Sequence, residues 1–445
     1  MKRLLVGVAL LLAFIAMTAH TQPRPQAPVP APVVALANVT VIDGRGGSPQ
    51  PAMTVLVQGE RIVDVRSSGT ELPDGATLVD LAGHYVVPGI FETHTHLTNR
   101  DLNGGRARVD RDLRRLLYAG VTTLRDMAGD ARLLAAVKRD LLLDRVVGPE
   151  IHYSALFAGP AFMALDQRIG LASIGYERGT APWQQTATAD TDVELAVAQA
   201  AQAGATGIKL YVGVDAPVMR ALADAARRHG LEVWAHSVVF PDRPIEVVRA
   251  GVDVVSHLCW LVWQDDDLDP STSVPYIHQR PPADPRPSFD PALVEADSPE
   301  MTALFAEMAR RGTIIDATHS VYRGPEGRNC APSLMTALAK AAHGAGVPLS
   351  TGTDWFTADD DPFPSVTVEI ERLVEEGILT PTEAITAATL NGARATGLEQ
   401  THGTIEAGKV ANLVVLRDNP LDDIGAIRSV VTVYKHGRAY PRADY

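Results

Sequence analysis

Residues 85–97, YVVPGIFETHTHL, hold the pattern around which the rest of the chain is organised. The apolar run over residues 85–92 predicts a buried strand that leads into His94 and His96. Residues i and i+2 of a strand point to the same side, so the two imidazoles can aim at one point. A metal site at a strand end requires that arrangement, although an isolated His-x-His pair is weak evidence by itself.

The middle of the chain, residues 85–400, alternates strand patterns with helical patterns. The predicted strands cover residues 85–91, 121–125, 150–155, 207–211, 232–235, 252–256, 313–316 and 347–351. Strands in alternation with helices imply βα units and a parallel sheet, and eight such units suggest a (β/α)8 TIM barrel. A doubly wound open sheet is the alternative, which is weakened because no G-x-G-x-x-G follows the first strand.

Four further potential ligands lie at the ends of later predicted strands: Lys209, His236, His257 and Asp354. A barrel brings the C-terminal ends of its strands to one face, where active sites of this fold are built. Four histidines and a carboxylate on that face indicate a metal site of the N/O type, suited to zinc, manganese, iron or cobalt.

Lys209 is the unusual member of this set, because a charged amine next to metal ions would be repelled. Burial and positive neighbours can keep the amine neutral. Alternatively, reaction with carbon dioxide converts it to an anionic carbamate, whose two oxygens are enough to bridge two metals. The plain structural alternative is a lysine whose stem packs at the strand end while its amine reaches solvent.

Two long connections follow strand ends, over residues 156–191 and 261–299, and the second is acidic and rich in proline. Connections of this length are usually functional. Because both leave the face where the candidate ligands gather, we expect lid and specificity loops.

Both ends of the folded chain are rich in β patterns, over residues 33–84 and 401–445, with turn signals such as Asp43-Gly44 and Asp74-Gly75. These patterns predict antiparallel hairpins. We expect the two ends to pair into one small β-sandwich domain with the barrel folded between them. Pro88-Gly89 marks the point where this domain hands over to the barrel.

The N-terminus predicts a signal peptide over residues 1–19, since a basic start precedes an apolar run over residues 4–17 and then small polar residues. The run is shorter than the roughly 20 residues that span a bilayer. We therefore expect a secreted or periplasmic protein without a stable membrane anchor after cleavage; an uncleaved anchor is the alternative. Residues 20–32 form a proline-rich spacer that should be extended.

The net charge of −13 argues against nucleic acid and anionic membrane as partners. The only two cysteines, Cys259 and Cys330, are too few for a disulfide scaffold. They could pair in an oxidising compartment, but two buried thiols are the preferred interpretation. A small-molecule substrate is the expected partner, and a homo-oligomer is left open.

The chain resembles the amidohydrolase superfamily of metal-dependent hydrolases, in its imidazolonepropionase-like and prolidase-like branch. The matching elements are residues 86–96, 120–126, 207–209 and 251–257, His236, residues 352–354, 387–391 and 403–416. The resemblance implies two divalent metal ions, with zinc preferred. His94, His96 and Asp354 would hold the first ion, His236 and His257 the second, and Lys209 would bridge both as a carbamate. A histidine would be expected in place of Lys209 in single-metal relatives.

The activity that this implies is hydrolysis of an amide bond by a hydroxide activated by two metals, in a dipeptide or an N-acyl amino acid. Asp354 would act as metal ligand and general base, with a ligand role alone as the plainer alternative. Tyr211 could donate to the carbonyl oxygen, or simply pack in the barrel. A cyclic amide, lactone or carbamate hydrolase is the enzymatic rival, and a metal-binding protein without turnover is the other.

Other polar residues carry weaker expectations. Asp316 and His319 end the seventh predicted strand, where substrate contacts are plausible, and His152 is expected to be a satisfied core histidine. Arg125 and Asp126 follow the second strand and are expected to form a structural ion pair. Gly352 and Gly392 are expected to meet backbone requirements and to have no chemical role.

Overall fold

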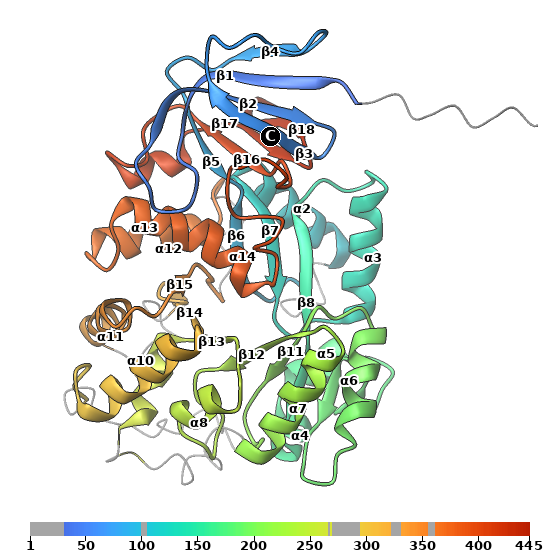
Figure 1. The fold of residues 1–445 in the computed structure, drawn as a ribbon. Coiled ribbons are helices and arrows are strands. Elements are labelled where there is room, and N and C mark those ends of the chain that lie inside the picture. Colours follow the sequence, from blue (N-terminus) through green and yellow to red (C-terminus); the bar gives the residue numbers. More distant parts are fainter. Residues whose placement is uncertain (1–30, 99–104, 266–267, 269–293, 322–330, 355–360) are drawn as a thin grey trace, which may run out of the picture. The chain divides into compact units, whose positions relative to one another are not determined.

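The computed structural model describes residues 31–98, 105–265, 268, 294–321, 331–354 and 361–445 (Figure 1). It divides into two units, residues 1–32 and 33–445. The predicted signal peptide over residues 1–19 lies outside the described residues, as does most of the spacer. In the described part of the chain, no helix has the length and apolar character needed to cross a membrane.

Eight parallel strands form the barrel, and the predicted (β/α)8 fold is confirmed. In order they are β6 (Ile90–Thr95), β7 (Val121–Asp126), β8 (Glu150–Ala158), β11 (Gly207–Leu210), β12 (Glu232–His236), β13 (Val254–Ser256), β14 (Ile314–Asp316) and β15 (Leu349–Ser350). The last strand returns to the first: the Thr93 amide donates to the Thr351 carbonyl at 3.1 Å, and the Asp354 amide donates to the His94 carbonyl at 2.8 Å. The doubly wound alternative is wrong, because an open sheet has no such closing bonds.

Amphipathic helices connect the strands. They are α2 (Gly105–Tyr118), α3 (Ala131–Leu142), α6 (Val193–Gln202), α7 (Ala216–Arg228), α8 (Pro244–Arg249), α10 (Pro299–Arg311), α11 (Pro332–Gly344) and α12 (Ser365–Glu375). Side-chain caps fix where several begin: Asp192 accepts from the Leu195 amide, and Asp215 accepts from the Val218 amide. After α12, the chain continues through α13 (Pro381–Thr386), the π-helix η7 (Ala387–Asn391) and α14 (Gly392–Ala395).

The small β domain is one sheet built from both chain ends, as predicted (Figure 1). Its strands are β1 (Val33–Val41), β2 (Gln50–Gln58), β3 (Arg61–Ser67), β4 (Thr77–Asp80), β5 (Tyr85–Pro88), β16 (Leu413–Leu416), β17 (Val430–Lys435) and β18 (Arg438–Pro441). The pairing is not antiparallel throughout, since β1 pairs in parallel with both β4 and β5. An isolated β-bridge pairs Arg61, in the edge strand β3, with Val410, in the segment before β16. The sheet therefore wraps around its own apolar core.

The strand predicted over residues 85–92 is two strands with different partners. β5 joins the small sheet between β1 and β16, whereas β6 opens the barrel. Gly89 separates them, and a Cβ there would come within 2.1 Å of Thr122 Oγ1. The handover predicted at Pro88-Gly89 is therefore a point where only glycine fits between the two sheets.

The connection after β8 carries its own structure: α4 (Pro160–Leu165), α5 (Gln167–Ala172), β9 (Thr180–Ala181) and β10 (Gln184–Thr186). β10 pairs in parallel with the C-terminal half of β8, through Gln184 with Leu156.

The connection after β13 begins as the 3-10 helix η2 (Leu258–Gln264), and residues 269–293 lie outside the described residues. Cys259, in η2, is disulfide-bonded, so the prediction that it is a buried free thiol is wrong. Cys330 lies outside the described residues.

Glu150, at the N-terminal end of β8, ties the barrel to the small sheet. Its carboxylate accepts from His436 in the turn between β17 and β18, and from Asn412 Nδ2 at 3.2 Å. His402 Nε2 lies 3.3 Å from the same oxygen, and His152 Nε2 lies 3.9 Å from the other. His152 therefore belongs to this junction. Its Nδ1 has no hydrogen-bond partner among the described residues, so the expectation of a satisfied core histidine is wrong.

Candidate metal centre

The barrel gathers the predicted ligands at the C-terminal ends of its strands. His94 lies in β6 and His96 directly follows it, Lys209 lies in β11, His236 ends β12, His257 follows β13 and Asp354 follows β15. Asp354 is central: its Oδ1 lies 2.9 Å from His96 Nε2 and 3.6 Å from His94 Nε2, and its Oδ2 lies 3.9 Å from His257 Nε2. The rings of His236 and His257 lie 4.7 Å apart between centroids.

Three of the histidines are held by their Nδ1 atoms. The partners are Asp316 Oδ2 at 2.8 Å from His94, the Val238 carbonyl at 3.0 Å from His236 and Thr318 Oγ1 at 2.8 Å from His257. A proton on Nδ1 donated to these acceptors leaves the lone pair on Nε2, the tautomer that metal ligation needs. For His94 and His257, Nε2 is the atom that faces Asp354.

A cation fits the gap between these groups. His94 Nε2 is buried and has no hydrogen-bond partner among the described residues. Leaving such an atom unsatisfied costs about 1–3 kcal/mol, which a metal ion would offset. One ligand atom from each of His94, His96 and Asp354 lies within 4.8 Å of the other two, close enough for a single ion. The donor set of imidazole and carboxylate suits zinc and its first-row neighbours.

The protonation states favour ligation at neutral pH. Burial lowers the pKa of His94 to about 4 and that of His236 to about 3. Burial alone would raise the pKa of Asp354, but His94, His96 and His257 hold it well below its usual range. Buried histidines are therefore neutral and the carboxylate is ionised, which leaves their lone pairs available to a cation.

Lys209 is buried beside this centre, and only 4% of the residue is exposed. The alternative prediction, in which its amine reaches solvent, is therefore wrong. Burial lowers the pKa of its amine to about 8, and the cations Arg168 and Arg125 act in the same direction. Lys209 Nζ lies 5.3 Å from the ring centre of Tyr211, which also packs edge-on against Phe162 at 4.9 Å.

Asp316 and His319, for which substrate contacts were expected, are bound to other groups of the protein. Asp316 lies behind His94, fully buried, and also accepts from Ser256 Oγ at 2.9 Å and Thr93 Oγ1 at 2.9 Å. His319 Nε2 lies 2.8 Å from Glu376 Oε2. Glu376 directly follows α12, so His319 is directed toward the helical layer, away from the barrel axis.

The expected ion pair of Arg125 exists with a different carboxylate. Arg125 Nη2 donates to Asp316 Oδ2 at 3.1 Å, and its guanidinium stacks on Trp234 at 4.7 Å. Asp126 instead accepts from the backbone amides of Leu97 at 2.6 Å and Gly129 at 2.7 Å, fixing the chain just beyond His96.

Glu92 is a supporting residue that sequence reasoning missed. Its Oε1 accepts from the backbone amides of His94 and Thr353, both at 3.0 Å, and its Oε2 accepts from Thr353 Oγ1 at 2.9 Å. The buried side chain of Glu92 thus connects β6, which carries His94, to the segment after β15, which carries Asp354. The available signal was an acidic residue inside an otherwise apolar strand.

Glycine and strained residues complete the floor of the site. A Cβ on Gly352 would lie 1.9 Å from Asp316 Oδ1 and 2.8 Å from His94 Cβ, and one on Gly392 would lie 2.4 Å from Phe91 Cβ. The expected backbone requirement is confirmed at both. His257 and Asp354 have positive φ values of 81° and 51°, a strained conformation that persists where surrounding structure enforces it.

A pocket of about 50 Å³ opens beside the centre. Its walls include His96, Lys209, Tyr211, His257 and Asp354, together with Met127, Ala128 and Leu156. The long connection after β8 supplies the remaining lining residues: Phe162, Arg168, Ile169 and Gln184. Nothing in the sequence singled out Arg168 or Gln184, because neither belongs to a motif.

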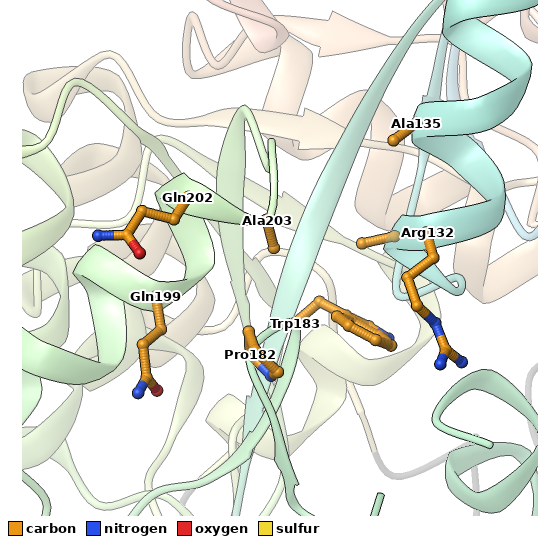
Figure 2. Close-up of a pocket in the computed structure, with 8 residues that line it drawn as sticks. Arg132, Ala135, Pro182, Trp183, Gln199, Gln202 and Ala203 are labelled. Atoms are coloured by element: carbon orange, nitrogen blue, oxygen red, sulfur yellow. The ribbon is translucent and has the colours of Figure 1, made fainter. Parts of the chain in front are cut away.

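A second cavity of about 330 Å³ lies between α3, α6 and the segment Pro182–Trp183 (Figure 2). Arg132 at its edge is paired with Asp130 at 2.7 Å and stacks 4.9 Å from the ring centre of Trp183. The indole of Trp183 donates to the Ala172 carbonyl at 2.8 Å, which fixes α5. Its lining residues include no histidine or carboxylate, and we assign it no chemistry.

Three comparisons relate the chain to known proteins. Residues 301–440 match the model of the Amidohydrolase family. An imidazolonepropionase from Flavobacterium johnsoniae is 42% identical over 73 residues, which are 16% of this chain and 18% of that protein. The ochratoxinase of Aspergillus niger is 36% identical over 100 residues, which are 22% of this chain and 20% of that protein. The chain thus spans about a fifth of the length of the curated relatives it matches.

Solved structures extend the likeness to the whole fold. A Xaa-Pro dipeptidase with methionine bound in its active site superposes with a TM-score of 0.69 at 20% identity, covering 92% of this chain and 100% of the other. The A. niger ochratoxinase structure gives a TM-score of 0.69 at 21% identity, covering 92% and 96%. Together, the family match, the imidazolonepropionase and ochratoxinase relatives and the shared fold support the assignment of the chain to the amidohydrolase superfamily.

Proposed function

We propose that the chain is an exported amidohydrolase that uses two divalent metal ions to hydrolyse the amide bond of a dipeptide or an N-acyl amino acid. The observation that carries the proposal is the convergence of three buried imidazoles and one ionised carboxylate, with His94 Nε2 lacking a hydrogen-bond partner among the described residues. Export rests on the signal predicted in residues 1–19.

Two ligand groups are proposed for two ions, with zinc preferred. His94, His96 and Asp354 would hold the first ion. His236 and His257 would hold the second ion. Two neutral donors hold a divalent ion poorly, so an anionic ligand has to complete this group. When bound, a pair of ions lowers the pKa of a water between them and polarises the substrate carbonyl.

Lys209 is proposed as the missing anionic ligand. A neutral amine adds to carbon dioxide, forming an N–C bond and releasing one proton, and the product is a carbamate with two oxygens. Support comes from the burial of Lys209, which lowers its pKa to about 8 and keeps part of the amine neutral near pH 7. An ammonium in that position has no lone pair to offer a metal.

Asp354 is proposed as general base in addition to its ligand role. Its carboxylate is ionised and lies within 3.9 Å of three of the ligand histidines, so it can take a proton from the attacking water and pass it to the leaving amine. Tyr211 is proposed as a donor to the carbonyl oxygen. Burial raises the pKa of its phenol, which keeps the donating proton in place.

Arg168 supports a substrate that carries a carboxylate. Its guanidinium lines the pocket and is oriented by Asp166, which accepts from Nε at 2.9 Å and Nη2 at 2.6 Å. Its charge also reaches Tyr211 and Asp354. A guanidinium held along one edge can bind a second carboxylate with its remaining donors. The dipeptidase relative, with methionine in its active site, agrees with an amino-acid-like ligand.

A cyclic amide hydrolase is the second candidate, favoured by the segment that is 42% identical to imidazolonepropionase. The test is a panel assay of protein reconstituted with zinc and bicarbonate, using dipeptides, N-acyl amino acids, cyclic amides, lactones and carbamates. Metal content is measured on the same samples. The proposal predicts close to two ions per chain and turnover of the open-chain amides. Fewer than one ion per chain, or turnover of cyclic amides alone, would overturn it.

A further inference from the structure

Gln184 lines the pocket at the metal centre and carries an unused hydrogen-bond acceptor. It is 1% exposed, and its Nε2 donates to the Ala128 carbonyl at 3.2 Å. Its Oε1 is buried and has no hydrogen-bond partner among the described residues. Because the Ala128 carbonyl can only accept, the amide nitrogen must face it. The orientation of the side chain is therefore fixed, and the atom left over is an acceptor.

The strand register places Gln184 in line with Lys209. Gln184 of β10 pairs with Leu156 of β8, and Leu156 pairs with Lys209 of β11. All three residues line the same pocket. Gln184 and Lys209 lie two strand spacings apart, which is about 10 Å between their Cα atoms. A small ligand whose carbonyl lies at the metal centre can therefore span the distance to Gln184.

The surroundings make this acceptor selective. Leu156, Phe162 and Ile169 form the apolar part of the pocket wall. An unsatisfied oxygen among such groups costs free energy, and a ligand without a donor leaves that cost unrelieved. Sites built to hydrogen-bond one group of a substrate reject analogues that lack it far more strongly than apolar pockets reject a missing methylene.

We propose that Gln184 is a specificity-determining residue, whose Oε1 accepts a hydrogen bond from an N–H group of the substrate. The inference rests on the proposed amide hydrolysis and narrows its substrates to secondary amides or amines with a free N–H on the side of β10. N-alkylated analogues of the same size are rejected. The hairpin of β9 and β10 is thus part of the substrate site, in addition to supporting the connection that carries Arg168.

The binding test uses zinc-loaded protein and N-methanesulfonyl-L-phenylalanine, a sulfonamide that resists hydrolysis and has an N–H. Its N-methyl derivative lacks that proton. Titration calorimetry of the wild-type chain is expected to show the N–H ligand binding about 10-fold or more tighter than the derivative. In Gln184→Met, which keeps the length and removes the acceptor, the two affinities converge. Equal discrimination in both proteins, or binding of neither ligand, would overturn the inference.

Two further variants separate recognition from packing. Gln184→Glu keeps an acceptor at the same position and is expected to retain preference for the N–H ligand. Gln185→Met is the matched control on the same strand, since the Gln185 side chain donates to the Pro182 and Ala196 carbonyls at 2.8 and 2.7 Å. It should lower the melting temperature without changing the ratio of the two affinities. A changed ratio in Gln185→Met would assign the effect to strand packing.

The kinetic test compares N-acetyl-L-phenylalanine with its N-methyl derivative. Gln184→Met is expected to raise KM for the first compound and to leave kcat within a few-fold, because Gln184 touches the bound ligand away from the reacting atoms. If the wild-type protein hydrolyses no amide of the panel, the proposed function fails, while the sulfonamide titration still decides the role of Gln184. A fall in kcat with unchanged KM would contradict the assignment.

Discussion

Oδ2 of Asp316 lies 2.8 Å from Nδ1 of His94, and both side chains are fully buried. The contact joins β14 to β6 across the barrel and turns the other imidazole nitrogen toward Asp354. Asp316 also faces Arg125 at 3.1 Å, so its charge is balanced on the side away from the centre. A carboxylate behind a ligating histidine fixes the tautomer and raises the basicity of the ligand.

Asp316→Asn should weaken metal binding by about 10–100-fold, since the amide is a poorer acceptor for the His94 proton. It should also destabilise the fold, because losing one partner of a buried ion pair costs about 3–5 kcal/mol. Zinc affinity is measured by competition with a chelator at a temperature where circular dichroism shows a folded chain. Ser256→Ala is the milder control, because it removes only the hydroxyl that donates to Asp316 Oδ2. Unchanged zinc affinity in folded Asp316→Asn would contradict the role.

Lys209→Ala should reduce the metal content from close to two ions per chain to close to one. The physical reason is that His236 and His257 alone give the second ion two neutral donors. Metal analysis after reconstitution with zinc and bicarbonate measures the result, and Lys209→Glu should recover part of the second ion by restoring an anion. Lys340→Ala, at an exposed position on α11, serves as control. Full activity in Lys209→Ala would remove the carbamate from the proposal.

Asp354→Asn should lower kcat by about 100- to 10,000-fold, the range typical of losing a general base. The side-chain oxygen can still ligate, so the folded structure and most of the first metal ion should remain. Steady-state kinetics, metal analysis and a melting curve on one sample separate these effects. If turnover survives while the metal content falls, Asp354 is a ligand and not the base.

His436→Gln should destabilise the chain at acidic pH more than at alkaline pH. The hydrogen bond to Glu150 raises the pKa of His436 above its ordinary value, so the folded state holds the proton more tightly than the unfolded state. This stabilisation is complete below about pH 6.5 and is lost as pH rises through the folded pKa. Because a third of the side chain is exposed, about 1 kcal/mol or less is expected.

The measurement is the difference in melting temperature between His436→Gln and the wild-type chain at pH 5.5 and pH 8.5. The control is His229→Gln, which removes a histidine 3.4 Å from Glu194 on the surface. A difference that grows toward alkaline pH would show that the contact with Glu150 does not stabilise the protonated form.

Gly352→Ala should disturb both the fold and the centre, because the added methyl group meets Asp316 Oδ1 at 1.9 Å and His94 Cβ at 2.8 Å. Overpacking of this kind costs about 1–3 kcal/mol. Denaturant unfolding and zinc affinity are measured together. In Gly344→Ala, at the end of α11, the added Cβ meets no atom within 4 Å, so that variant should be neutral. Equal stability of the two variants would refute the packing argument.

Local patterns were enough to predict the barrel and to place the candidate ligands at its strand ends. Each candidate stands at the end of an apolar run, and the closed parallel sheet brings such ends together whatever the details of packing. The strand over residues 85–92 shows the limit of this reasoning. One apolar run of suitable length serves two sheets, and the division at Gly89 depends on how closely Thr122 approaches.

The sequence by itself determined which residues can ligate a metal, the alternation that builds the barrel and the pairing of both chain ends. Only the tertiary structure decided which polar groups support them. His94 and Asp316 are 222 positions apart, and the carboxylate of Glu92 bonds the Thr353 amide 261 positions away. A ligand is recognisable from its own strand, whereas a buried hydrogen bond depends on two side chains whose directions are fixed only when the barrel closes. For the same reason, no pattern disclosed that Gln184 lines the pocket with an unpaired Oε1.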